Sequence, residues 1–164
     1  MTQEVRDLIT STGNQVVPIN NIRSFWHGLF WRFYPAGDNS IERFISRDLD
    51  SRLNVREKAA IDEWIASGKP VHVMRDHKHH GYAMPGGMWG CIGGYIPDIE
   101  RLVQDWSDVN AKGCDQRFLA RVVWPRVKDN SIAHDEFFNG RFGGIWRKFP
   151  KHPKFDGHVG QIVR

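Results

Sequence analysis

The tripeptide Asp48-Leu49-Asp50 places two carboxylates one residue apart, directly after a short run that is typical of a strand. Two hard oxygen ligands at a strand end suit Mg²⁺ or Mn²⁺, because these ions keep bound waters and share their coordination with phosphate oxygens. The alternative is that Asp48 and Asp50 cap the helix that follows them. The first interpretation predicts a phosphate-binding metal site.

A second group of polar residues follows the next apolar run. Arg75-Asp76-His77 either orients the hydroxyls of a sugar or forms an ion pair that holds a loop. The closely spaced His77, His79 and His80 either bind Zn²⁺ or are solvated surface side chains. The sequence leaves both pairs of alternatives open.

Further candidates lie in the second half of the chain. Gly86–Gly94 contains too much glycine for a helix and indicates a strand or loop whose backbone another group approaches closely. Within this segment, Trp89 is either a platform on which a sugar stacks or a core residue. Asp115-Gln116 either contacts a substrate or complements the dipole of a helix that starts there. His134 and the aspartate after it are either site residues or a surface pair.

The composition indicates one folded domain that spans residues 1–164. Hydrophobic residues make up 40% and charged residues 26% of the chain, which is enough to form a core. The formal charge of +4 is modest and the basic residues are spread along the chain, so we expect no nucleic-acid partner. No stretch approaches the roughly 20 apolar residues that a membrane span needs. Cys91 and Cys114 form no CxxC pair, which favours a reducing, cytoplasmic location.

Apolar spacing and turn residues predict the elements that position these side chains. The clearest is a helix over 54–68, because Asn54 and Glu57 form a capping box and Gly68 ends the periodic pattern. The other elements predicted in the first half are a helix over 3–10, a strand over 15–19, a buried helix over 25–34 and strands over 42–47 and 71–75.

In the second half, one predicted helix follows Pro97, and another begins at Asp115 and stops at Pro125. Residues 129–164 predict largely irregular structure.

The succession of strand, helix and strand before residue 76 predicts an α/β fold, with a mostly parallel open sheet and helices on both faces. Ligands bind beyond the carboxyl ends of the strands in such sheets. We therefore expect Asp48, Asp76 and the glycine-rich segment to lie along one edge.

The order of the motifs is more specific than any one of them. The motifs are, in chain order, Phe30-Trp31-Arg32-Phe33, Ser46-Arg47-Asp48-Leu49-Asp50-Ser51-Arg52, Arg56-Glu57-Lys58, Met74-Arg75-Asp76-His77, Gly86-Gly87-Met88-Trp89-Gly90 and Asp115-Gln116-x-Phe118-Leu119. Together they resemble a family of bacterial and viral glycosyltransferase-like proteins that have the nucleotide-diphosphosugar transferase fold called GT-A, over roughly residues 15–160. The Asp-x-Asp after a strand, the glycine-rich strand and the downstream Asp-Gln are more distantly similar to glycogenin-like retaining transferases.

The resemblance implies roles for residues that match the family's motifs. Asp48 and Asp50 are implied ligands of a divalent metal that bridges the donor's diphosphate, and His134 is an implied third ligand. Asp115 and Gln116 are the implied catalytic pair beside the donor sugar.

The resemblance also implies a set of donor-binding residues. The glycines form the floor under the donor sugar, and the Arg-Asp-His motif forms its wall. Because 47 residues precede Asp48, we expect a domain that is short at its N-terminus compared with the family, which begins with a strand and loop that grip the nucleotide base. The implied donor-binding residues are Arg47, Arg75, Asp76, His77, Gly86, Gly87 and Trp89.

The expected function is metal-dependent transfer of a sugar from a nucleotide-diphosphosugar donor to a glycan or small-molecule acceptor. One alternative is a haloacid-dehalogenase-like phosphatase with Asp48 as its phosphoryl nucleophile, although Ser46 and Arg47 interrupt the apolar run that such a site usually follows. Another is a catalytically inactive sugar-binding module.

Overall fold

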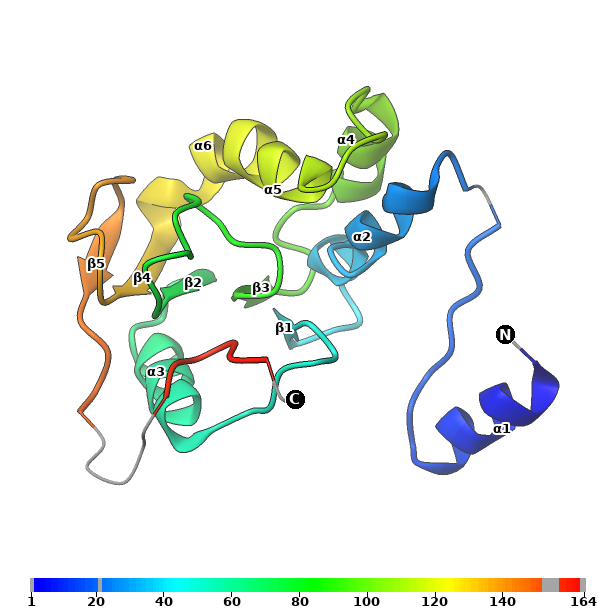
Figure 1. Cartoon of the computed structure of the whole chain (residues 1–164), viewed down its shortest axis with the longest axis horizontal. Coiled ribbons are helices and arrows are strands. Elements are labelled where there is room, and N and C mark those ends of the chain that lie inside the picture. Colours follow the sequence, from blue (N-terminus) through cyan, green and yellow to red (C-terminus); the bar gives the residue numbers. More distant parts are fainter. Residues whose placement is uncertain (1, 21, 152–156, 163–164) are drawn as a thin grey trace.

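Five strands form one open sheet, which together with the helices gives the chain the predicted α/β fold (Figure 1). The computed structural model describes residues 2–20, 22–151 and 157–162. The order across the sheet is β1-β3-β2-β4-β5. In chain order, the strands are β1 (Arg43–Ser46), β2 (Val71–Arg75), β3 (Trp89–Ile92), β4 (Ser131–Asp135) and β5 (Ile145–Arg147).

The sheet is mixed, so the prediction of a mostly parallel sheet is confirmed only in part: β3 runs against the other four strands. β4 is parallel to both β2 and β5, whereas β3 is antiparallel to both β1 and β2. β1 and β2 therefore run in the same direction, but β3 lies between them. The reason is that the loop over 76–88 reverses the chain after β2, so the next strand returns beside it.

Six α-helices accompany the sheet in the described part of the chain. α3 starts where the sequence predicts, because the Asn54 side chain accepts a hydrogen bond from the Glu57 backbone N–H at 2.9 Å. None of the described helices is both long and apolar enough to cross a bilayer. The α-helices are α1 (Gln3–Ser11), α2 (Gly28–Trp31), α3 (Val55–Ala66), α4 (Ile99–Asp105), α5 (Cys114–Phe118) and α6 (Trp124–Val127). Shorter helical turns are η1 (Phe25–His27), η2 (Tyr34–Gly37), the π turn η3 (Leu119–Val123) and η4 (Lys128–Asn130).

Two predictions near the N-terminus are wrong. Residues 15–19 form no strand, because a strand needs a hydrogen-bonded partner and none of the described strands pairs with this segment. The helix predicted over 25–34 is divided into η1, α2 and the start of η2. α1 is present as predicted, but it buries none of its residues and lies apart from the sheet (Figure 1).

Two predictions in the second half are confirmed only in part. The helical segment that contains Asp115 continues past Pro125 to Val127, because the π turn η3 ends just before it. Pro125 then lies in the first turn of α6, where its missing N–H is not needed. β4 and β5 lie within residues 129–164, which the sequence predicts to be largely irregular, and most of the other described residues there are irregular. β4 lacks an apolar pattern because its five buried residues include serine, histidine and aspartate.

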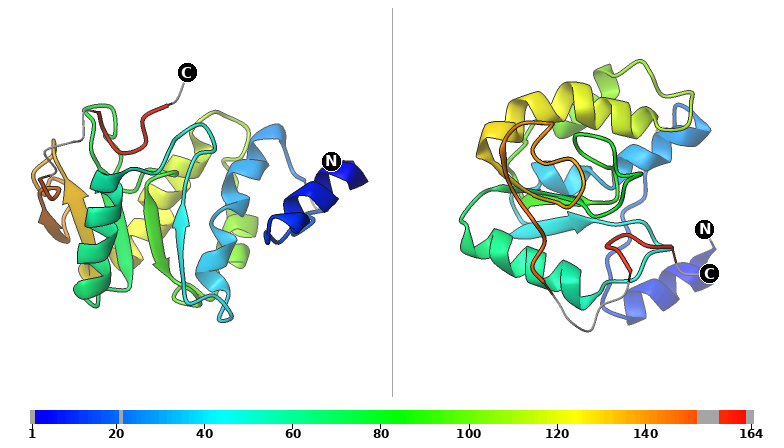
Figure 2. Two further views of the ribbon diagram at one scale, coloured as in Figure 1. Left: turned by 90° about the horizontal axis from the view of Figure 1, so that it is seen from below. Right: turned by 60° about the vertical axis from the view of Figure 1, so that its left-hand side comes forward.

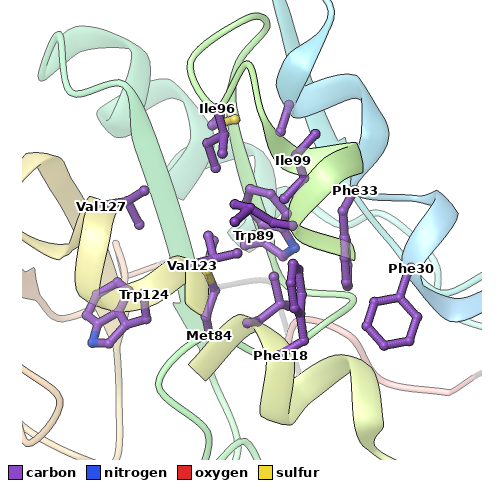
Figure 3. Packing of buried hydrophobic residues seen from close by; sticks show 14 of the residues in the cluster. Phe30, Phe33, Met84, Trp89, Ile96, Ile99, Phe118, Val123, Trp124 and Val127 are labelled. Atoms are coloured by element: carbon purple, nitrogen blue, oxygen red, sulfur yellow. The ribbon is translucent and has the colours of Figure 1, made fainter. Parts of the chain in front are cut away.

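The main hydrophobic core lies between the sheet and the helices α2, α4, α5 and α6. Figure 3 shows Trp89 of β3 within it, close to Phe33 and Phe118. The Trp89 ring centroid is 5.7 Å from that of Phe33. α3 packs through Trp64, whose ring stacks on His72 of β2 at 5.1 Å. Figure 2 shows the strands lying between α3 and the helices α5 and α6.

The carboxyl ends of β1, β2 and β4 and the start of β3 lie along the same side of the sheet. Ser46 at the end of β1 pairs with Trp89 at the start of β3, and Arg75 at the end of β2 pairs with Asp135 at the end of β4. The loops that leave this edge carry Asp48, Asp76 and the start of the glycine-rich segment, as expected.

Candidate functional site

An arginine between two carboxylates forms the centre of the candidate site. Arg32 Nη2 lies 2.7 Å from Asp115 Oδ2, and Arg32 Nη1 makes a second ion pair with Asp48 Oδ1. The Asp115 side chain is 3% exposed, whereas that of Asp48 is 57% exposed. We refer to Arg32, Asp48 and Asp115 as the Arg32 cluster; it joins a buried carboxylate to a solvent-accessible one.

Three separate elements bring the Arg32 cluster together. Arg32 is the C-cap residue directly after α2, and Asp48 lies in the loop after β1. Asp115 lies in the first turn of α5, after Gly113, whose φ of 77° is in the left-handed region that favours glycine. The cluster therefore exists only in the folded chain.

Two glycines let the backbone pass directly against these charges. A Cβ at Gly86 would lie 2.5 Å from Arg32 Nη2 and 2.7 Å from Asp115 Oδ2, and one at Gly87 would overlap Asp48. Ser46 Oγ donates to the Gly86 carbonyl at 2.7 Å, which fixes the loop against β1. Glycine is therefore required at both positions, because any side chain there would displace the ion pairs of the Arg32 cluster.

The cluster lines two adjoining cavities of about 510 and 600 Å³. Both cavities are lined by Leu29, Arg32, Asp48 and Gly160. The smaller cavity is lined also by His79, His80, Tyr82, Pro85, Gly86, Gly87, Met88, Lys112, Gly113, Asp115 and Gln116. The larger of the two is lined also by Gly28, Arg47, Leu49, Asp50 and Ile162. The predicted residues Asp48, Asp50, Gly86, Gly87, Asp115 and Gln116 therefore share one region.

A cavity of about 860 Å³ lies elsewhere, between residues 15–19, η2 and α4. None of the residues that the sequence singles out for chemistry lines it. The Arg32 cluster is the better candidate, because convergent charged groups say more about a site than volume does.

Trp89 and Arg75, predicted to bind the donor, are instead buried structural residues. Trp89 is 0% exposed in the core, so of its two interpretations the structure supports the core residue. Arg75 is 1% exposed and pairs with Asp135 at 3.2 Å while its Nε donates to the Tyr82 carbonyl at 3.1 Å. Burial lowers the pKa of Arg75 to about 10, although its partner Asp135 opposes the shift. Arg75 thus holds the loop after β2 and does not line the cavities.

Arg47 is also largely buried, at the back of the site. Its guanidinium forms an ion pair with Glu57 of α3, and its Nη1 donates to the Gly87 carbonyl at 2.7 Å. Burial lowers the pKa of Arg47, and Glu57 opposes that shift. The side chain supports the glycine loop from behind.

Asp76 binds protein groups in place of the predicted sugar. Arg56 of α3 donates to both of its carboxylate oxygens, at 2.8 and 2.9 Å, and the Val159 backbone N–H donates at 3.0 Å. Val159 belongs to the segment 157–162, which we call the C-terminal strap. Gly160 of the strap lines both cavities, and Ile162 forms a β-bridge with Ser51. Asp76 therefore acts as an anchor that keeps the strap beside the site.

The histidines after β2 pack against the strap. The His77 ring stacks on His158 with centroids 4.4 Å apart, and His80 lies 5.7 Å from His158. Burial, followed by the proximity of His158 and His77, lowers the pKa of His80 to about 4. His79 and His80, rather than His77, line the smaller cavity. His80 is therefore uncharged at neutral pH, and its Nδ1 accepts the Asp76 backbone N–H at 3.1 Å.

His134 does not fit the role of a metal ligand. It is fully buried in β4, where its Nδ1 lies 2.7 Å from His72 Nε2 and its Nε2 lies 3.1 Å from Glu63 Oε2. Because the Glu63 carboxylate accepts a hydrogen bond from Nε2–H of His134, the Nδ1 atom of the neutral His134 ring is an acceptor. His72 Nε2–H therefore donates to it. Both ring nitrogens therefore have protein partners. The structure thus does not support the role of third metal ligand that the resemblance implied for His134.

The remaining implied ligands suit a hard divalent ion. In the described part of the chain, no three His, Cys, Asp or Glu side chains are arranged to hold a metal ion. Asp48 and Asp50 nevertheless line the same open cavity. Mg²⁺ is usually bound by one or two carboxylates together with waters and substrate phosphates, so this pair of oxygen donors fits such an ion.

Reasoning from the sequence assigned no role to Arg32 or Lys112. Arg32 occurs within an aromatic run, Phe30-Trp31-Arg32-Phe33, where a lone charge was a usable signal that it needs a buried partner. Lys112 carried no comparable signal, since it lies in a polar loop. Both line the smaller cavity and provide positive charge there.

No protein-family model, curated protein or solved structure matches this chain. The function is therefore inferred from the geometry of the site together with the motifs in the sequence.

Proposed function

We propose that this chain is a metal-dependent glycosyltransferase, which moves a sugar from a nucleotide-diphosphosugar donor to a glycan or small-molecule acceptor. The observation that carries the proposal is the meeting of Asp48, Asp115 and Gln116 with Gly86 and Gly87 at one cavity. The family resemblance assigns these residues to the donor's diphosphate, its reacting sugar and the floor beneath the sugar. Their convergence from three separate segments is what a single donor site requires.

Asp48 and Asp50 would hold the divalent ion, Mn²⁺ or Mg²⁺. The ion would neutralise the diphosphate as it leaves. Arg32 and Lys112 line the neighbouring cavity and supply fixed positive charge for the same diphosphate. The charge of the site is therefore suited to an anionic leaving group.

The buried carboxylate of Asp115 would act at the sugar. As the bond between the anomeric carbon and the diphosphate oxygen breaks, positive charge develops on the sugar ring and a nearby carboxylate stabilises it. The Gln116 amide can donate to and accept from sugar hydroxyls. The acceptor oxygen then forms its bond to the anomeric carbon, and its proton passes to a base or to water.

The proposal includes the GT-A-like arrangement, with helices on both faces of the sheet, and a cytoplasmic location. In that compartment Cys91 and Cys114 would stay reduced. Both are free thiols in the structure, and burial raises the pKa of Cys91 to about 12, which makes it unreactive.

The test is release of nucleoside diphosphate from a panel of nucleotide-diphosphosugars, with Mn²⁺ or with EDTA. We expect Mn²⁺-dependent release by the wild-type chain, and loss of Mn²⁺ binding of about tenfold or more by calorimetry in Asp50→Ala, because the cation loses charge and a ligand. Phosphate release from an aryl phosphate would favour the phosphatase alternative. Donor binding without turnover would favour the sugar-binding module, and unchanged Mn²⁺ affinity in Asp50→Ala would contradict the metal assignment.

A further inference from the structure

The guanidinium of Arg32 connects two carboxylates to which the proposed function gives different tasks. In the proposed function, Asp48 binds the metal ion at the diphosphate, and Asp115 stabilises the positive charge that develops on the sugar. Arg32 donates to both, and within the described part of the chain its Nε is buried with no hydrogen-bond acceptor. A buried N–H donor without an acceptor is costly to stability.

The two ion pairs of Arg32 differ in strength. Asp115 is 3% exposed, so separating it from Arg32 would leave a buried charge uncompensated. Asp48 is 57% exposed, and ion pairs that are open to water contribute little to stability. The contact with Asp48 can therefore be exchanged at low cost, whereas the contact with Asp115 holds the guanidinium in place.

We propose that Arg32 is a phosphate-binding residue that exchanges Asp48 for a phosphate group of the ligand while Asp115 holds it at the cavity wall. The planar guanidinium presents paired N–H groups that match phosphate oxygens. The exchange leaves the Asp48 carboxylate available to a divalent cation. The identity of the ligand as a diphosphate rests on the proposed function, whereas the exchange itself rests on the contacts of the cluster.

The exchange has a signature that a structural arginine would not show. In Arg32→Gln the guanidinium no longer competes with the metal ion for the Asp48 carboxylate. The affinity for Mn²⁺ alone should therefore rise by about fivefold, as expected for the loss of a partly exposed ion pair. The same substitution removes a phosphate contact, so inorganic pyrophosphate at saturating Mn²⁺ binds more weakly, by about tenfold. The two affinities move in opposite directions.

The experiment is a calorimetric titration of the wild-type chain, Arg32→Gln, Arg32→Lys and Arg101→Gln with Mn²⁺ alone, and then with pyrophosphate at saturating Mn²⁺. Arg101 is a matched control, because it also contacts two carboxylates, Asp98 at 3.0 Å and Asp105 at 3.2 Å, but lies outside both cavities. We expect Arg101→Gln to leave both affinities unchanged. Arg32→Lys keeps the charge opposite Asp115 and covers the case in which Arg32→Gln does not fold.

Arg32→Lys should keep the wild-type affinity for Mn²⁺ and lose affinity for pyrophosphate, because an ammonium lacks the paired N–H groups. The proposal is overturned if both affinities shift in the same direction in Arg32→Gln, if neither shifts, or if Arg32→Lys binds pyrophosphate like the wild type. Opposite shifts without turnover of any sugar nucleotide would overturn the proposed function and support the role of Arg32. Turnover of a sugar nucleotide without the opposite shifts would support the proposed function and overturn the role of Arg32. A wild-type chain that binds neither Mn²⁺ nor pyrophosphate would overturn both proposals.

Discussion

Arg32 and Arg56 each contact one buried carboxylate and one that is more accessible to solvent. Arg32 joins Asp115, 3% exposed, to Asp48, 57% exposed. Arg56 joins Asp76, also 3% exposed, to Glu136, 36% exposed. By charge and burial alone the two clusters would be given the same role.

The surroundings of the two arginines differ. Arg56 lies 4.7 Å from the Phe149 ring centroid and donates to the Pro150 carbonyl at 3.3 Å, and its partner Asp76 also accepts the Val159 N–H. Protein groups thus surround the Arg56 cluster. The Arg32 cluster lines two cavities instead. A charge cluster is a candidate for ligand binding when it lines a cavity. Which side chains form the ion pairs does not by itself distinguish a binding cluster from a structural one.

The largest expected effect tests the structural side of this comparison. Arg56→Ala leaves the Asp76 carboxylate buried without its cation, so the free energy of unfolding should fall by about 3 kcal/mol. Denaturant unfolding followed by circular dichroism measures the change. Arg101→Ala, at a pair that is largely exposed, is the control and should change little. A loss in Arg56→Ala no greater than in the control would contradict the stabilising role of the ion pair between Arg56 and Asp76.

The next effect tests the functional side. Asp115→Asn keeps the shape of the side chain but removes the charge that faces Arg32, so turnover of the donor should fall by about 100-fold or more while the chain remains folded. The readout is nucleoside diphosphate release at saturating donor. Asp108→Asn, which alters a carboxylate paired with Arg117 away from the cavities, should keep full turnover. Full turnover in Asp115→Asn would remove Asp115 from the reaction.

A third prediction concerns the glycine that touches the Arg32 cluster. In Gly86→Ala the new Cβ forces Arg32 and Asp115 to move, so the free energy of unfolding should fall by about 1–3 kcal/mol. Gly81→Ala is the matched control, because a Cβ there would come no closer than 3.7 Å to the Phe138 ring. Equal stabilities of the two variants, measured by denaturant unfolding, would mean that the loop adapts without disturbing the ion pairs.

The smallest effect concerns a third polar cluster, which is closed like that of Arg56. Burial lowers the pKa of both His72 and His134 in the folded chain, with their mutual proximity adding to the shift at His72 and Glu63 opposing that at His134. Folding therefore favours the neutral form of both rings, so their contribution to stability is present above the unfolded pKa of about 6.5 and is lost as the pH falls below it. We expect the free energy of unfolding to fall by up to about 1.4 kcal/mol per pH unit for each histidine.

Denaturant unfolding at pH 7.5, 6.5 and 5.5 measures this dependence. His72→Gln should reduce the slope between pH 6.5 and 5.5, since it removes one of the histidines whose pKa is lowered in the folded chain. A wild-type stability that stays constant or rises towards pH 5.5 would show that the pair accepts a proton without cost.

Local patterns were sufficient for the parts of the fold whose forces act between near neighbours. The helix α3 was predictable because the Asn54 cap and the apolar stripe are both written within one segment. The common direction of β1 and β2 was also predictable, because a helix lies between these two strands in the chain. The position of β3 between them was not, since it depends on which edges pair across the sheet.

The site was predictable to a similar degree. The motifs identified Asp48, Asp115 and the glycine pair, and the folded chain brings them to one cavity. The same motifs suggested donor contacts for Trp89 and a metal for His134. Both side chains are buried among partners from distant segments, and no spacing rule reveals such partners.

The sequence by itself determined that the chain forms an α/β domain and that carboxylates, glycines and an Asp-Gln pair are available for chemistry, because composition, periodicity and capping act locally. Only the tertiary structure decided which charges face a cavity and which hold the protein together. Arg32 and Arg56 differ in this respect because burial and pairing arise from contacts between distant segments. The charge of a side chain is written in the sequence, but its solvent exposure and its partners exist only once the chain has folded.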